Sequence, residues 1–328
     1  DEDGDTDIVT GTRSIPFRYG EPGGIHIYRN QGEGIFEIVD APSDLTELGL
    51  LTDAAVGDFN RDGKTEVVIV GEWMQPLAIT WNGEKFVREA LFEDMPSGLY
   101  KSVFSADFNG DGKPDLIFGN YGTNTRLSAS RSHPLTWHIS DYDQNGRIDH
   151  ILSIYEGDTL YPLILFQDLS KQLPVMRKRF QTFSNYGNAT TNNVLKGLNH
   201  SGERRLICES LESYLWLNGN STIVPLPWQA QLSPVYAAAE MDIDQDQHME
   251  FIIGGNQKRV KPELGAYNSS FGTVLKWKED GLVALPSAES GFWVRGEIRQ
   301  LIAMPIDDRG SLVVIRNNDN LEVFTYSE

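Results

Sequence analysis

A nine-residue pattern, Asp-x-(Asp/Asn)-x-(Asp/Asn)-Gly-x-x-(Asp/Glu), recurs along this chain, and an apolar stretch follows each copy at once. Intact copies occupy residues 58–66, 107–115 and 141–149. Oxygen atoms at positions 1, 3, 5 and 9, a carbonyl at position 7 and a turning Gly at position 6 can surround one hard cation. The pattern therefore predicts repeated calcium loops that each lead into a β-strand. A metal-free hairpin turn rich in Asp and Asn would explain one copy well but the recurrence poorly.

Two further copies are incomplete. Residues 1–7 fit if Asp1 takes position 3, which predicts that the natural chain extends upstream, and 242–250 keeps its acids but has Gln247 in place of Gly. In that last copy Gln247 would have to adopt the turn. We expect three to five Ca²⁺ ions in all. The expected ligands are side chains at positions 1, 3, 5 and 9 and the carbonyls at position 7: Asp58, Asn60, Asp62, Lys64, Glu66, Asp107, Asn109, Asp111, Lys113, Asp115, Asp141, Asp143, Asn145, Arg147, Asp149, Asp1, Asp3, Asp5, Asp7, Asp242, Asp244, Asp246, His248 and Glu250.

Composition excludes several classes of protein. The 328 residues are 40% hydrophobic and include no apolar run long enough to predict a membrane span. A formal charge of −19 argues against binding to nucleic acid, because phosphate recognition needs a basic face. The single cysteine, Cys208, excludes an internal disulfide, and its apolar neighbours predict a buried small hydrophobe.

The spacing of strands and turns predicts one repeated unit. In residues 51–92 the calcium loop is followed by apolar strands near 66–70, 77–80 and 85–87, with an Asn-Gly turn before the last. Four antiparallel strands in about 50 residues are typical of one propeller blade. Repeats starting near 1, 58, 107, 141, 199, 242 and 303 predict an all-β, seven-bladed propeller in a single domain over 1–328, truncated at its N-terminus. Six or eight blades stay possible because the copies near 199 and 303 are weak. A short helical insertion is expected near 167–183, in the fourth blade.

The loop followed by a strand resembles the FG-GAP/VCBS repeat of integrin α-subunit propellers. A closer similarity is to the C-terminal propeller of secreted VCBS/ASPIC-UnbV-type proteins of Bacteroidetes, on the segments 119–124, 141–149, 172–180, 288–292 and 317–324. This resemblance implies the last propeller of a longer, exported protein on the outer surface of a Gram-negative bacterium, joined to upstream domains. It implies no reaction.

Three functions are compatible with these features. The first is a binding module for a glycan or a protein, using loops on the face opposite the metal loops, where aromatic and basic side chains suit sugar rings or acidic groups. The second is a polysaccharide-active enzyme on a calcium propeller, for which no catalytic residue is predicted and only His133 is a candidate to test. The third is a purely structural domain of a larger surface protein. The expected ligand-binding residues are Arg18, Tyr19, Trp73, Tyr121, Arg126, Arg131 and Arg259.

Overall fold

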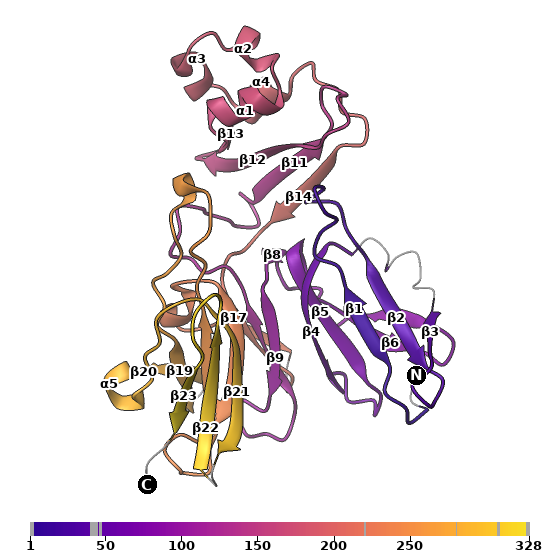
Figure 1. Cartoon of the computed structure of the whole chain (residues 1–328), viewed down its shortest axis with the longest axis vertical. Coiled ribbons are helices and arrows are strands. Elements are labelled where there is room, and N and C mark those ends of the chain that lie inside the picture. Colours follow the sequence, from indigo (N-terminus) through magenta and orange to yellow (C-terminus); the bar gives the residue numbers. More distant parts are fainter. Residues whose placement is uncertain are drawn as a thin grey trace.

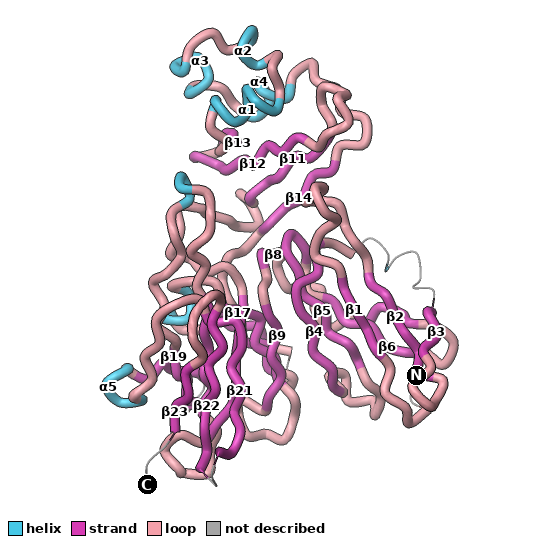
Figure 2. The backbone as a smooth tube through the Cα atoms, viewed as in Figure 1, coloured by secondary structure: helices cyan, strands magenta, loops and turns pink. Residues whose placement is uncertain are grey.

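A computed structural model describes residues 3–39, 45, 48–219, 221–279, 281–306 and 309–325. Its described strands form six antiparallel sheets, which confirms an all-β chain. Five of these sheets follow one another in chain order below, and the sixth lies above them with a group of short helices (Figures 1 and 2). We call the five the blade sheets and the upper unit the insertion.

The blade sheets share one antiparallel design. Each begins with the strand that contacts the neighbouring sheets, and the successive first strands β1, β4, β9, β17 and β21 contact one another in that order. The first two sheets are β1 (Ile8–Gly11), β2 (Ile25–Asn30) and β3 (Phe36–Val39), then β4 (Leu50–Gly57), β5 (Glu66–Met74), β6 (Leu77–Trp81), β7 (Phe86–Glu89) and the short β8 (Gly98–Leu99).

The remaining three blade sheets are built from strands in the second half of the chain together with β9 and β10. The third contains β9 (Ser102–Ala106), β10 (Asp115–Gly119), β15 (Tyr214–Leu217) and β16 (Thr222–Pro225). The fourth contains β17 (Val235–Met241), β18 (Glu250–Gly255), β19 (Thr273–Lys278) and β20 (Gly281–Leu285), and the fifth contains β21 (Ile298–Ile306), β22 (Arg309–Arg316) and β23 (Glu322–Thr325).

The second strands β5, β10 and β18 are mainly apolar and are buried on both faces. Every residue of β5 is buried. Successive side chains of a strand point to opposite faces, so Val67 and Ile69 join the core against blade sheet one, while Val68 and Val70 join the core against blade sheet three. Equivalent cores fill the spaces between sheets three and four and between sheets four and five. The five sheets therefore stack face to face as propeller blades do.

The insertion replaces two of the predicted blades. Its sheet has the order β13 (Thr159–Pro162), β12 (Asp149–Glu156), β11 (Leu135–Ser140) and β14 (Arg204–Cys208). The blades expected to start near 141 and 199 are therefore wrong: the first belongs to this separate sheet, and the second divides between β14 and blade sheet three. Seven blades are not confirmed, since the described residues form five blade sheets.

The insertion enters and leaves blade sheet three at one point. It separates β10 from β15, which nevertheless pair directly. At its base Asn120 donates through Nδ2 to the Ser210 carbonyl at 3.0 Å, and the Gly122 N–H donates to the Leu211 carbonyl at 2.8 Å. The two ends of a segment of about ninety residues are thus hydrogen-bonded side by side.

Short helices cover one face of the insertion sheet. They are α1 (Phe166–Gln172), α2 (Met176–Arg179), α3 (Phe183–Gly187) and α4 (Thr191–Leu195). The helical insertion expected near 167–183 is confirmed and continues to residue 195. Along β12, Ile151 packs beneath the helices whereas Leu152 faces the blade loops. Elsewhere, the described residues also form the short helices Trp228–Gln231, Pro262–Leu264 and α5 (Ser287–Ser290). None of the described helices is long and apolar enough to span a membrane.

Candidate functional site

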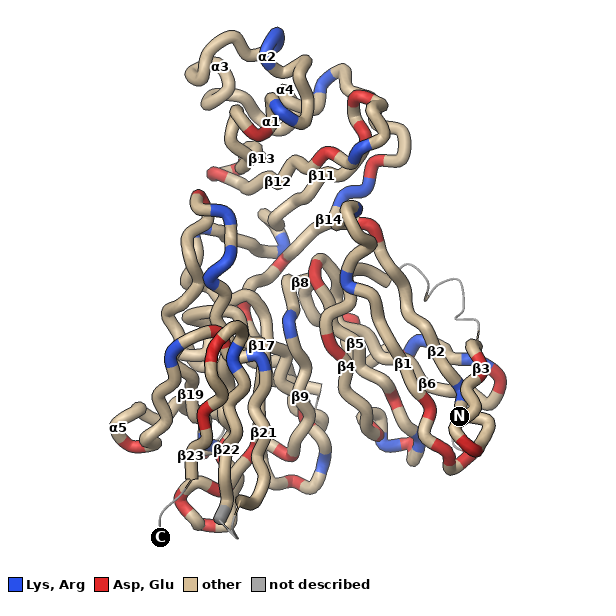
Figure 3. Tube along the Cα trace, viewed as in Figure 1, with Lys and Arg blue, Asp and Glu red and all other residues tan. Residues whose placement is uncertain are grey.

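The predicted calcium loops connect first and second strands. Loops 58–66, 107–115 and 242–250 join β4 to β5, β9 to β10 and β17 to β18, and loop 141–149 joins β11 to β12 of the insertion. The ninth residue of each loop begins the second strand, as the pattern predicts. Figure 3 shows acidic segments at the lower ends of the blade sheets. Loop 141–149 lies apart from them in the insertion, which corrects the expectation that all metal loops share one face.

Loop 58–66 gathers its acids around a common point. Ligand oxygens of Asp58, Asp62 and Glu66 lie within 4.8 Å of one another. Gly63 has the left-handed φ of 85° that the tight turn requires, and its N–H donates to Asp58 Oδ2 at 3.1 Å. The Lys64 N–H donates to Asp62 Oδ1 at 2.8 Å. The turn itself therefore holds the carboxylates in place.

Two buried oxygens of this loop lack a hydrogen-bond partner. Glu66 is fully buried, and its Oε2 accepts from the N–H groups of Phe59 at 2.7 Å and Asn60 at 3.1 Å, while Oε1 is unpartnered, as is Asp58 Oδ1. Burial raises the pKa of Glu66, and the nearby Asp62 and Asp58 charges add to the rise. Buried polar atoms are rarely left without a partner. A divalent cation would satisfy both oxygens, so calcium fits the residues present.

Loop 141–149 repeats this arrangement in the insertion. Oxygens of Asp141, Asp143 and Asp149 lie within 4.8 Å of one another. Gly146 has a φ of 82° and donates to Asp141 Oδ2 at 2.7 Å, and the Arg147 N–H donates to Asn145 Oδ1 at 2.8 Å. Burial, followed by the Asp143 and Asp141 charges, raises the pKa of Asp149 to about 6. A bound cation would relieve this mutual repulsion.

Loop 107–115, although intact in sequence, is arranged differently. Asp115 is fully buried, and both its oxygens accept hydrogen bonds, Oδ2 from the Phe108 N–H at 3.2 Å and Oδ1 from the Asn218 N–H at 2.8 Å. Lys113 Nζ forms an ion pair with Asp111 Oδ2 at 3.0 Å. The amide of Asn109 accepts from the Asp111 N–H, and Asp107 accepts from the Gly112 N–H. The described side chains of this loop are thus engaged within the protein.

The two incomplete copies of the pattern are residues 242–250 and residues 1–7. Gln247 adopts the expected turn, with a φ of 71° and its N–H donating to Asp242 Oδ2 at 3.0 Å. The His248 N–H donates to Asp246 Oδ1 at 2.8 Å. In the first copy Asp1 lies outside the described residues. There the Asp5 N–H donates to Asp3 Oδ1 at 3.0 Å, and Asp7 Oδ1 accepts from the Asn30 N–H at 2.8 Å.

The residues expected to bind ligand separate into packed and exposed groups. Trp73 and Tyr121 are each 8% exposed and belong to the core beneath the insertion, so the expectation that they present ligand-binding surface is corrected. Trp73 has a φ of 63°, a strained value for a bulky residue, and its ring meets Trp137 of β11 at 5.1 Å. Packing against the insertion offsets that strain.

Most of the basic residues expected to bind ligand instead contact neighbouring segments of the chain. Arg126 donates to the Glu263 carbonyl at 2.7 Å, and Arg131 donates to the Asp94 carbonyl. Arg18 forms an exposed ion pair with Glu21 at 2.6 Å. Arg259 is exposed on the loop between β18 and β19. Arg126 also lines one cavity, and Tyr19 lines another.

That cavity lies between the insertion and the blade loops and has a volume of about 520 Å³. Its wall is mainly apolar, and its rim is charged, with Lys261 Nζ 3.7 Å from Asp168 Oδ2 of α1. Within the wall, the rings of Tyr19 and Trp137 are 5.3 Å apart. The lining residues are Tyr19, Trp137, His150, Leu152, Leu163, Ile164, Asp168, Lys171, Gln172, Lys261, Glu263 and Leu264.

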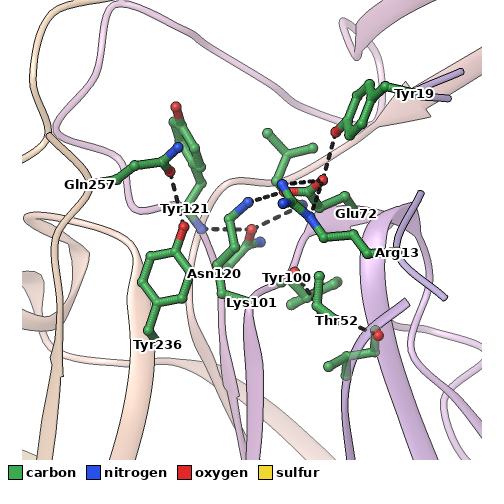
Figure 4. A network of polar contacts seen from close by, with 12 residues as sticks. Arg13, Tyr19, Thr52, Glu72, Tyr100, Lys101, Asn120, Tyr121, Tyr236 and Gln257 are labelled. Atoms are coloured by element: carbon green, nitrogen blue, oxygen red, sulfur yellow. Dashed lines mark hydrogen bonds and ion pairs between the residues drawn. The ribbon is translucent and has the colours of Figure 1, made fainter. Parts of the chain in front are cut away.

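Beneath the cavity, a buried ionic network joins three blade sheets (Figure 4). Glu72 of β5 is 4% exposed and accepts from Arg13 at 2.8 Å, from the Tyr19 hydroxyl at 2.6 Å and from Lys101. Burial opposes its charge, but Lys101 and then Arg13 outweigh burial and lower the pKa of Glu72 to about 2. The sequence pattern does not predict this network; its one visible signal is Glu72, an acid inside the apolar run of β5.

Comparison with known proteins agrees with the loops and blade sheets. The FG-GAP-like repeat family matches residues 1–69 and 58–118. Residues 1–118 therefore contain FG-GAP-like repeats, and the fold is all-β with propeller-type blade sheets.

Distant similarity extends to cartilage acidic protein 1. The Xenopus tropicalis protein is 31% identical over 122 residues, which are 34% of this chain and 18% of that protein. The Homo sapiens and Mus musculus proteins are each 28% identical over 203 residues, or 54% of this chain and 30% of theirs. The chain thus spans less than a third of each of these curated relatives.

Proposed function

We propose that this chain is a calcium-stabilised, extracellular binding module whose ligand, a glycan or a segment of another protein, occupies the cavity between the insertion and the blade loops. The observation that carries the proposal is the cavity itself. It combines an aromatic and aliphatic wall with a charged rim, which is the usual composition of a site for a specific ligand. The FG-GAP-like repeats support an interaction role outside the cell.

The wall and the rim would make separate contributions. Tyr19 and Trp137 offer ring surface to a sugar or to an apolar side chain. Lys171 and Lys261 can donate to hydroxyl or carboxylate groups, and Asp168 can accept. Because Lys261 pairs with Asp168 across the opening, a ligand with its own charges would exchange one ion pair for another. Specificity is then expected to come from the rim and affinity from the wall.

Calcium would act on stability in this proposal. The unpartnered oxygens of Glu66 and Asp58 support an ion in loop 58–66, and the three clustered carboxylates support one in loop 141–149. The second of these lies at the start of β12, whose Leu152 lines the cavity. We therefore infer that calcium in the insertion also keeps the cavity wall in place. A location on the outer surface of a Gram-negative bacterium, beside upstream domains, belongs to the same proposal.

We infer a binding role rather than catalysis. His133, the histidine chosen for testing, contacts Asp158 at 3.2 Å on an exposed surface and does not line the cavity. The acids of the described loops serve turns and candidate cation sites. Turnover of a polysaccharide by the protein, lost on His133→Ala, would establish the enzymatic alternative instead. The structural alternative predicts that the cavity has no ligand.

Arrays of glycans and of extracellular proteins, probed with the whole chain with and without calcium, test the proposal. Leu264→Trp fills the cavity from a residue of its lining, and Leu321→Trp makes the same change at an exposed position on blade sheet five. Binding of any array component should be lost in Leu264→Trp and kept in Leu321→Trp. Undiminished binding by Leu264→Trp would place the ligand elsewhere, and a lack of any binding would favour the structural role.

A further inference from the structure

A lysine side chain lies inside the acidic loop of blade sheet four. Lys276 Nζ is 2.6 Å from Asp244 Oδ2, 2.7 Å from Asp246 Oδ2 and 2.9 Å from Glu250 Oε1. These three acids hold positions 3, 5 and 9 of loop 242–250, which are the positions that surround calcium in an intact loop. The ammonium group donates hydrogen bonds to Asp244 and Asp246 and forms an ion pair with Glu250.

Strand register explains how the lysine reaches this point. Phe251 of β18 stands opposite Leu275 of β19, so Glu250 at the start of β18 stands opposite Lys276. In blade sheet two the residue opposite Glu66 is Thr80, whose hydroxyl donates to the Thr65 carbonyl at 3.1 Å. Glu66 there retains a buried oxygen without a hydrogen-bond partner; Glu250 Oε1 likewise accepts no hydrogen bond, but it lies 2.9 Å from the Lys276 ammonium. The two sheets therefore differ at one register position, and the sheet with lysine has its ninth carboxylate paired with a positive charge.

We propose that the Lys276 ammonium is the resident cation of loop 242–250, so that this loop closes without calcium. The Lys276 side chain is 16% exposed and Glu250 is fully buried, so the pair is shielded from solvent. An ion at the centre of Asp244, Asp246 and Glu250 would have to displace the ammonium. In this proposal the ammonium takes the place of the ion predicted at Asp242, Asp244, Asp246, His248 and Glu250.

The repeats would then differ in how their stability depends on calcium. Loops 58–66 and 141–149 respond to the calcium concentration in the proposed function, whereas blade sheet four keeps its loop closed at any calcium concentration. Carboxylates that face one another without a cation repel. Calcium could take the place of a deleted ammonium, so loss of the lysine should destabilise the chain most when calcium is removed.

Melting in excess EDTA tests this inference independently of whether calcium binds elsewhere. Lys276→Met should lower the melting temperature by about 4 °C or more, and Lys278→Met, an exposed lysine on the same strand, should change it little. In a triple variant that adds Asp244→Asn and Asp246→Asn to Lys276→Met, most of the loss should return, because the unpaired charges are gone. Equal melting temperatures for the two lysine variants, or no recovery in the triple variant, would overturn the proposal.

The calcium count provides a second measurement. Bound calcium per chain, measured by elemental analysis after equilibrium dialysis, should be the same in the wild type and in Asp244→Asn/Asp246→Asn. A count lower by one in that variant would show that the loop binds calcium and would overturn the inference. Asp62→Ala is the matched control for the proposed function, since it alters loop 58–66 and should remove one ion. Failure of that control would refute calcium there while leaving the melting test of Lys276 intact.

Discussion

Replacing Glu72 by Gln tests whether the buried network beneath the cavity holds three blade sheets together. The substitution keeps the size of the side chain but removes the charge that faces Lys101 and Arg13. Lys101 is 5% exposed, so its ammonium would be left buried beside a neutral amide. Breaking a buried ion pair by removing one partner costs about 3–5 kcal/mol, since the remaining charge is uncompensated.

The acidity of Glu72 gives a second measure of the same effect. Its pKa falls from 4.5 to about 2 in the folded protein, and 1.4 kcal/mol per tenfold change in acidity makes this worth about 3 kcal/mol. Because the folded pKa lies below the unfolded one, the stabilisation is complete above pH 4.5 and is lost as the pH falls towards 2. The difference between wild type and Glu72→Gln should therefore be greatest near neutral pH and should shrink by about 1–2 kcal/mol by pH 3.5.

Urea unfolding at a series of pH values, in constant calcium, measures this difference. Glu21→Gln removes the acid of the exposed pair with Arg18 and should cost less than about 1 kcal/mol at any pH. A loss in Glu72→Gln as small as that of the control would show that the network contributes no net stability. A loss that does not change between pH 7 and pH 3.5 would show that it does not arise from the charge of Glu72.

Three further outcomes are expected. EDTA should lower the melting temperature of the wild type, because an ion that binds only the folded state stabilises it. Asp62→Ala should reproduce part of this loss and should respond less to EDTA. An unchanged melting temperature on chelation would contradict calcium in the loops. Burial raises the pKa of Cys208 to about 12, so a thiol reagent at pH 8 should label it in urea but not in the folded protein, and rapid labelling of the folded protein would contradict its burial. Trp73→Ala should lower the free energy of unfolding in urea by about 3–5 kcal/mol. Trp228→Ala, at a side chain 68% exposed, should leave that free energy nearly unchanged. Similar losses in the two variants would contradict the packing role of Trp73.

Local features of the fold could be predicted from the sequence because they depend on neighbouring residues. The change from polar loop to apolar strand at Glu66, Asp115, Asp149 and Glu250 marks the start of β5, β10, β12 and β18. Gln247 adopts the turn that the spacing demands of it. Pro174 ends the first helix of the insertion, because it cannot continue the hydrogen-bonding pattern.

The pairing of distant strands could not be predicted in the same way. The interval from Asp107 to Asp141 has the length of a short blade, and no local pattern shows that β10 pairs with β15 beyond the insertion. The same limit applies to the candidate sites. An acid in β5 and a lysine in β19 are visible in the sequence, but their partners are determined by register and by packing between sheets. The cavity also depends on this placement, since the insertion supplies one wall and the blade loops supply the other.

The hydrogen-bonded base of the insertion has a consequence for how the chain folds during synthesis. When β10 leaves the ribosome its partner β15 has not yet been made, so half of blade sheet three must wait with one edge unpaired. A disordered segment of this length would make the later pairing slow, because its ends would rarely meet. An insertion that folds as it emerges, with Gly122 beside Leu211, instead delivers β15 to the waiting edge. The folded insertion thus holds β15 close to β10 until blade sheet three is complete.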